Sequence, residues 1–173
     1  MSKNIDPSQQ EIRDTVKEFA EKEIHPVSDQ LDRMAEPRKF PIDLYKKMGA
    51  AGFIGCNIPK DLGGQGKSRL QYVTLIEELS YHDAAVGLLC AVGEMAASPM
   101  VLFGSDQQKK KYVPDCASGK TIPAFVLTEP GAGADVSSLN TVAVEDGDHF
   151  VVNVEKMFIM HGDVAEVGVL FCR

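Results

Sequence analysis

Apolar side chains recur at helical spacing in the first part of the chain. Ile12, Val16, Phe19, Ala20 and Ile24 follow one another with acids and lysines between them. This spacing is typical of one face of a helix. The pattern therefore predicts a surface helix that packs one face inward.

Two local signals bound this first helix. Ser8 and Glu11 have the spacing of a capping box, so we expect the helix to begin near residue 8. Pro26 is expected to kink or end it, because proline lacks the backbone N–H that a helix interior needs. A helical pattern resumes to about Met34.

Four further helices are expected before Gly119. Proline at a first turn, Ser or Asp caps and apolar periodicity indicate them. They begin near Pro41, near Ser68, after Asp83 and at Ser105, and we expect bends at Pro99 and Pro114 and a glycine-rich loop over 61–66.

The helix after Asp83 is apolar nearly all round, which predicts a central buried helix. Close packing would explain Gly87 and Gly93 within it. The apolar run reaches Glu94 too early for a membrane span, so we expect none.

The pattern changes after Gly119. Short β-prone runs occupy residues 122–128, 141–145, 148–152 and 166–172, and Asp146-Gly147 indicates a hairpin turn. We therefore predict an α+β protein, with an all-α helical domain over residues 1–119 and the start of a β-barrel-like domain over 120–173. The last run would leave an unpaired sheet edge, so we expect the β domain to be incomplete.

Composition narrows the function classes. The chain has 173 residues, 44% of them hydrophobic, and a net charge of −7, which disfavours nucleic-acid binding. Four separated cysteines and four unpaired histidines show no ligand spacing, so we expect idle thiols and no metal. The N-terminus has no apolar signal segment, and we expect a cytoplasmic protein.

The candidate site is a strand that ends in a glycine-containing turn. Residues 125–128 form a short apolar run, and Pro130, Gly131 and Gly133 follow before Asp135. One interpretation is a strand with an ordinary tight turn. The other is that glycines leave peptide N–H groups open to a flat ring or a phosphate. The glycine spacing matches neither the dinucleotide fingerprint nor a Walker loop.

Two motifs resemble signatures of the acyl-CoA dehydrogenase family. Residues 124–135 (AFVLTEPGAGAD) are similar to its flavin- and substrate-contacting signature. Residues 147–153 (GDHFVVN) and 156–159 (KMFI) are similar to its second signature. The resemblance covers nearly all of this chain but only about half of the family's length. It implies a helical domain, a β domain and a C-terminal four-helix domain that together hold FAD and an acyl-CoA thioester.

The resemblance also implies roles for individual residues. Phe125, Val126, Leu127 and Thr128 would run beside the flavin ring, with the Thr128 hydroxyl at the pyrimidine edge. Gly131, Gly133 and Ala134 would lie where the flavin phosphates and the CoA chain pass, with Ala134 also facing the substrate. Phe158 would pack on the flavin face opposite the substrate, and Ile159 and Met160 would approach its N5 edge.

Four positions depart from the family pattern. Ala134 replaces a serine, and Val154 replaces the glycine of an Asn-Gly turn. Met160 and His161 replace a Thr-Asn pair, and a thioether cannot donate the hydrogen bond that the threonine gives to N5. We therefore expect altered flavin chemistry, and we expect His161 to be a satisfied surface histidine.

The family's catalytic base is a glutamate of the C-terminal domain, which this sequence lacks. Glu129, Glu94 and Glu77 are the alternatives, and no pattern places any of them beside a substrate proton. We assign no catalytic residue.

The resemblance leads to three functional hypotheses. One is part of an FAD-dependent acyl-CoA dehydrogenase that desaturates acyl-CoA thioesters. It would be incomplete alone, would pass electrons to an electron-transfer flavoprotein, and would form a homo-oligomer or pair with a complementing C-terminal half. The second is a non-catalytic interaction or binding module derived from that family. The third is a chain without a stable function, left by truncation.

Overall fold

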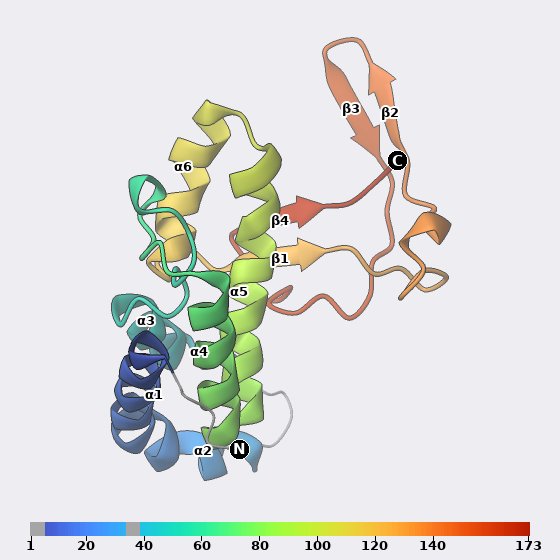
Figure 1. Cartoon of the computed structure of the whole chain (residues 1–173). Coiled ribbons are helices and arrows are strands. Elements are labelled where there is room, and N and C mark those ends of the chain that lie inside the picture. Colours follow the sequence, from blue (N-terminus) through green and yellow to red (C-terminus); the bar gives the residue numbers. More distant parts are fainter. Residues whose placement is uncertain (1–5, 34–38) are drawn as a thin grey trace.

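The computed structural model describes residues 6–33 and 39–173. Helices occupy the first part of the chain and short strands the last part (Figure 1). The helical elements are α1 (Pro7–Phe19), a π-helical segment (Ala20–Ile24), α2 (His25–Asp32), α3 (Ile42–Ala50), α4 (Arg69–His82), α5 (Ala84–Phe103) and α6 (Asp106–Ala117), with 3₁₀ turns at Lys60–Leu62 and Val136–Ser138. The strands are β1 (Pro123–Val126), β2 (Ala143–Asp146), β3 (His149–Val152) and β4 (Val167–Leu170).

The first helix begins earlier than predicted, because its cap is Asp6. The Asp6 side chain accepts a hydrogen bond from the Ser8 backbone N–H, and Pro7 takes the first turn. The capping box expected between Ser8 and Glu11 is therefore wrong. An aspartate followed by proline is a stronger start signal, and it caps the helix two residues sooner.

Pro26 does not end the helical path. Residues Ala20–Ile24 widen into a π-helical turn, and α2 resumes with Pro26 in its first turn. A first-turn proline has no hydrogen bond to lose, so the path continues. Helix α2 confirms that the helical pattern resumes after Pro26, and the predicted end near Met34 lies outside the described residues.

The predicted caps of the later helices are confirmed. Ser68 and Gln71 form a capping box at α4, and Ser105 and Gln108 form one at α6. Asp83 accepts hydrogen bonds from two backbone N–H groups at the start of α5. These signals lie within four residues of each helix start, so local sequence suffices to find them.

Helix α5 runs unbroken for 20 residues and contacts α4, α6, β1 and β4. Pro99 lies inside it without ending it. The helix is long and apolar enough to cross a membrane, with a mean hydropathy of 1.8, so the expectation that its apolar run is too short is wrong. In the structure 56% of this window is buried inside the protein, as is common for a core helix.

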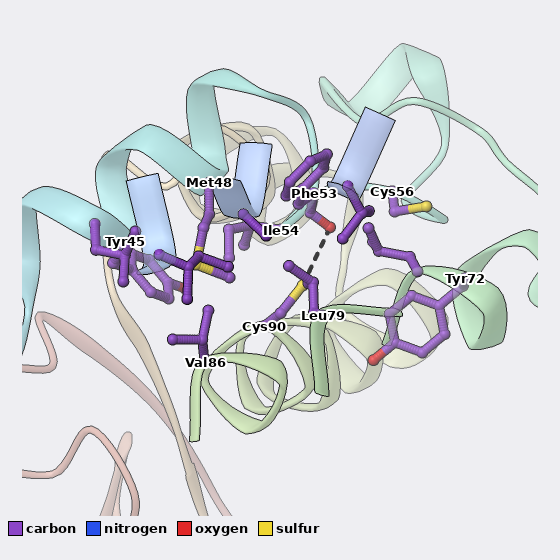
Figure 2. Packing of buried hydrophobic residues seen from close by; sticks show 14 of the residues in the cluster. Tyr45, Met48, Phe53, Ile54, Cys56, Tyr72, Leu79, Val86 and Cys90 are labelled. Carbon is purple, nitrogen blue, oxygen red and sulfur yellow. Dashed lines mark hydrogen bonds between the residues drawn. The ribbon is translucent and has the colours of Figure 1, made fainter. Parts of the chain in front are cut away.

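The main core lies where α1, α3, α4 and α5 meet (Figure 2). Tyr45 and Met48 of α3 are fully buried beside Val86 and Cys90 of α5, and the Cys90 thiol donates to the Phe53 carbonyl at 3.5 Å. Close packing explains the two helical glycines as predicted. A Cβ on Gly87 would lie 2.1 Å from the Ser80 Oγ, and one on Gly93 would lie 2.7 Å from the Tyr45 hydroxyl.

The strands form two separate pairs. β1 and β4 pair in parallel beside α5, whereas β2 and β3 form the predicted antiparallel hairpin with Gly147 in its turn at φ 66°. Figure 1 shows this hairpin standing away from the helices. The described residues form no closed barrel, and the overall α+β architecture agrees with the prediction.

The cysteines are free thiols. Cys56, Cys90 and Cys116 are buried, and Cys172 is exposed. Burial raises the pKa of Cys56 to about 11 and that of Cys116 to about 12. These thiols stay protonated at neutral pH and are poor nucleophiles. Within residues 6–33 and 39–173, no group of three or more His, Cys, Asp or Glu side chains is placed to hold a metal ion.

Candidate flavin-binding wall

The predicted strand lies at the junction of the helical part and the sheet. β1 pairs with β4, so that Phe125 lies opposite Val169. The Phe125 and Phe171 rings stand 4.7 Å apart between centroids. Residues 125–128 are all half-buried, which leaves part of this strand end accessible.

The turn that follows is closed by two backbone hydrogen bonds between Glu129 and Ala132, of 3.0 and 3.1 Å. Gly131, Gly133 and Ala134 are exposed. Neither glycine has a positive φ, so the backbone of this turn does not need the left-handed conformation that favours glycine. Their effect is to leave space, because a Cβ on Gly133 would meet no atom within 4 Å.

A polar hollow runs along one side of the turn. It is lined by Gly131, Asn140, Asn153 and Glu155, among others. The amides can donate hydrogen bonds, but the exposed Glu155 carboxylate adds a negative charge to the same hollow. The site therefore offers peptide and amide donors to an anion rather than a concentration of positive charge.

A buried ion pair behind the strand end was missed by the sequence analysis. Lys156 and Glu129 lie 2.9 Å apart, and each side chain is 5% exposed. The Lys156 ammonium also donates to the Leu127 and Phe171 carbonyls, both at 2.8 Å. No periodicity distinguishes this lysine from a solvated one, because all of its partners are distant in sequence.

The Glu129 carboxylate is saturated with donors. Besides Lys156, it accepts hydrogen bonds from the Asn140 backbone N–H at 2.6 Å, from the Thr141 backbone N–H at 3.1 Å and from the Thr141 hydroxyl. The hydrogen bonds from Lys156, Thr141 and Asn140 lower the pKa of Glu129 to about 2. Such a carboxylate is a poor proton acceptor at neutral pH.

The other two acids considered as bases are also engaged. Glu94 is 7% exposed. Burial opposes its ionisation, but hydrogen bonds from Ser98, Asn57 and Arg69 outweigh burial and hold its pKa below the ordinary value. Glu77 forms an ion pair with Arg13 on the exposed side of α4. None of these three acids is a free carboxylate facing the strand end.

The two sequence motifs meet at Thr128. The Met157 backbone N–H donates to the Thr128 carbonyl at 3.0 Å. Ile159 lines the same hollow as Ala124, Val126 and other residues of the β1–β4 pair. The structure therefore brings Phe125–Thr128 together with the start of the Phe158–Met160 segment.

Phe158 is 84% exposed and has a φ of 55°. A bulky residue at positive φ is a conformational outlier. An exposed aromatic ring gains little from packing within the chain, so the described fold does not explain why this position is not glycine. Strain of this kind occurs at ligand contacts.

Met160 faces a different part of the molecule. Its side chain lines a cavity of about 260 Å³ between α2, residues 39–41 and the start of α5, together with Leu31, Leu89 and others. The structure therefore does not bring the Met160 side chain to the hollow that Ile159 shares with Val126.

His161 is buried, at 4% exposed, and the expectation of a surface histidine is wrong. Its ring packs edge-on against Phe40 and Tyr45, and its Nδ1 donates to the Pro123 carbonyl at 2.9 Å. Its Nε2 has no hydrogen-bond partner among residues 6–33 and 39–173. Burial lowers the pKa of His161 below 6.5, although the bond to Pro123 opposes this shift.

This burial predicts an acid-sensitive fold. Because the folded pKa is lowered, the unfolded chain binds a proton that the folded chain does not, so stability falls as the pH drops below 6.5. In a His161→Asn variant the free energy of unfolding should depend less on pH, because asparagine does not titrate. Asparagine also adopts the φ of 64° more readily than most residues. Urea unfolding between pH 8 and 5 measures the free energy of unfolding at each pH. His149→Asn is the control, because the His149 side chain is 77% exposed. An equally steep profile in His161→Asn would contradict the assignment.

Comparisons with known proteins agree with this architecture. The family description "Acyl-CoA dehydrogenase, N-terminal domain" matches residues 6–120, and "Acyl-CoA dehydrogenase, middle domain" matches residues 124–173. A short-chain specific acyl-CoA dehydrogenase of Clostridium acetobutylicum is 40% identical over 172 residues, which are 99% of this chain and 45% of the relative.

Two solved structures share the fold. One, described as an electron transferring flavoprotein of Acidaminococcus fermentans, has a TM-score of 0.89 and 38% identity over 99% of this chain and 45% of its own. The other is an acyl-CoA dehydrogenase complexed with FAD from Bacillus anthracis, with a TM-score of 0.88 and 28% identity over 100% of this chain and 30% of its own. The chain thus spans less than half the length of these relatives.

The helical part, the strand pair beside α5 and the two motifs that meet at Thr128 define a flavoprotein dehydrogenase fold. The chain belongs to the acyl-CoA dehydrogenase family.

Proposed function

We propose that this chain is part of an FAD-dependent acyl-CoA dehydrogenase that catalyses α,β-desaturation of acyl-CoA thioesters. The observation that carries the proposal is the junction at Thr128, where a half-buried strand end and an exposed aromatic segment are hydrogen-bonded to each other. FAD, when bound, supplies the hydride acceptor for such a reaction.

The residues present fit this cofactor. Phe125, Val126 and Leu127 offer apolar side chains on the two faces of the strand end, and Val126 shares the face of Thr128. An apolar side chain suits a flat ring, and the Thr128 hydroxyl is available for the polar edge of that ring. Phe158 is free to cover a ring face, because 84% of its surface is exposed. Ile159 borders the same hollow as Val126.

The turn would receive the charged part of the ligands. Gly131 and Gly133 are exposed, and the open space beside Gly133 among the described residues admits a group in close approach. Ala134 would meet the substrate with a methyl group instead of a hydroxyl. Met160 would contribute no hydrogen bond to N5, because its side chain faces the cavity beside α2 and α5 and because a thioether cannot donate one.

None of the three acids considered as a base is free to remove the substrate α-proton. Glu129, Glu94 and Glu77 are held by other partners, as shown above. A complementing C-terminal helical polypeptide would supply the base, either within a longer chain or as a second subunit. An acyl-CoA, an electron-transfer flavoprotein and further copies of this chain are the other expected partners, in the cytoplasm.

Flavin titration tests the proposal. The purified chain is expected to bind FAD, seen as quenching of flavin fluorescence and a structured visible band. Addition of an acyl-CoA should bleach this band only slowly, because a positioned base contributes about 10²- to 10⁴-fold. A folded chain that binds no FAD would contradict the proposal.

A second candidate is a non-catalytic binding module of the same family. The engagement of all three acids favours it, as do the missing donors at Ala134 and Met160. It predicts a folded, oligomeric chain that binds no flavin. Such a chain shows no visible flavin band for acyl-CoA to bleach.

A further inference from the structure

All three N–H donors of the Lys156 ammonium have hydrogen-bond acceptors. A protonated lysine has three N–H donors. In this structure they reach the Leu127 carbonyl, the Glu129 Oε1 and the Phe171 carbonyl at 2.8 to 2.9 Å. Because the side chain is 5% exposed, these bonds face little competition from water.

These bonds surround Thr128. Lys156 donates to the carbonyl of Leu127, which precedes Thr128, and to the carboxylate of Glu129, which follows Thr128. Met157, the neighbour of Lys156, donates its N–H to the Thr128 carbonyl itself. Three successive residues of the strand end are thus tied to two successive residues of the second motif.

The same ammonium joins the two strands of the parallel pair. Leu127 follows β1 and Phe171 follows β4, so Lys156 bridges both chains just beyond their paired residues. Glu129 extends the network to Asn140 and Thr141, which precede the hairpin. Since side chains alternate along an extended segment, the inward turn of Glu129 directs the Thr128 side chain to the opposite face.

We propose that Lys156, with Glu129, is a positioning residue that aims the Thr128 hydroxyl at the flavin. It acts through the strand end and touches no flavin atom. This inference rests on the proposed FAD site. Its physical basis is that a hydroxyl held in place before binding loses less entropy when it meets its partner.

The experiment compares FAD binding by the full chain carrying Lys156→Met, Thr128→Val or both. Lys156→Met should weaken FAD binding about tenfold and shift the visible flavin band. The double variant should bind no more weakly than the weaker single variant, because both changes remove the same contact. Lys120→Met is the matched control, since it breaks an exposed lysine–carboxylate pair with Asp115 on α6.

Stability is measured alongside by thermal unfolding without FAD, and binding is measured below the unfolding transition of each variant. If Lys156→Met does not fold, FAD binding by Lys156→Arg is measured in its place. It keeps the charge, but its planar guanidinium cannot reproduce donation in three directions, so weaker FAD binding is again expected.

Two results overturn the inference alone. One is unchanged affinity and spectrum in the folded lysine variant while the unmodified chain binds FAD. The other is full additivity of the two single changes. Failure of the unmodified chain to bind FAD overturns the proposed function and this inference together.

Discussion

A Phe158→Gly variant is expected to bind FAD about 100-fold more weakly while its free energy of unfolding rises by about 1 kcal/mol. The two effects have opposite signs because they come from different parts of the residue. The Phe158 backbone has a φ of 55°, which glycine adopts without strain. Its ring is 84% exposed, so deletion removes little packing within the chain.

The loss of affinity follows from burial of the ring by the ligand. Covering an aromatic side chain contributes about 1.5–3 kcal/mol, and ring stacking adds about 0.5–1.5 kcal/mol. Fluorescence titration and urea unfolding measure the two quantities. Phe150→Gly is the matched control, because Phe150 is 66% exposed in β3 without a positive φ. It should lose stability and keep its FAD affinity. If Phe158→Gly keeps full affinity, Phe158 does not cover the flavin.

A Gly49→Ala variant is expected to lose about 3 kcal/mol of stability. In most helices this substitution gains about 1 kcal/mol, so the sign itself tests the structure. A Cβ on Gly49 would lie 2.2 Å from the Ser118 carbonyl oxygen and 2.7 Å from the Gly119 Cα. Both are backbone atoms, and no rotamer change can relieve the overlap.

The contact at Gly49 also connects the helical part to the candidate site. Ser118 and Gly119 form the turn after α6, and β1 begins at Pro123 shortly beyond it. Thermal and urea unfolding measure the loss. Gly133→Ala serves as the control for stability, because a Cβ there would meet no atom within 4 Å. Equal stability of Gly49→Ala and the unmodified chain would contradict the packing of α3 against this turn.

Helix caps and turns were predictable because their partners are close in sequence. The caps Ser68, Asp83 and Ser105 lie where the sequence indicates, and the hairpin turn falls one residue later than predicted, at Gly147-Asp148. The error at Ser8 is also local, and it arose where two caps compete within one turn. Asp6 outcompetes Ser8 as a cap, and a π-helical turn accommodates the proline.

The candidate site also has features that the sequence predicts and features that it does not. The strand end and the glycine turn are visible in the sequence, although the glycines leave space instead of adopting unusual angles. The burial of Lys156 and of His161 was not predicted. Lys156 bonds to Leu127, 29 residues away, and His161 to Pro123, 38 residues away.

The order of residues alone determined the helical first part, the β-prone second part and the two motifs, because periodicity and turn chemistry act over a few residues. Only the tertiary structure decided that the motifs join at Thr128, that a lysine is enclosed behind them and that Met160 faces elsewhere. Burial and hydrogen-bond saturation are properties of the packed chain, since they depend on carbonyls and carboxylates that folding brings from distant positions.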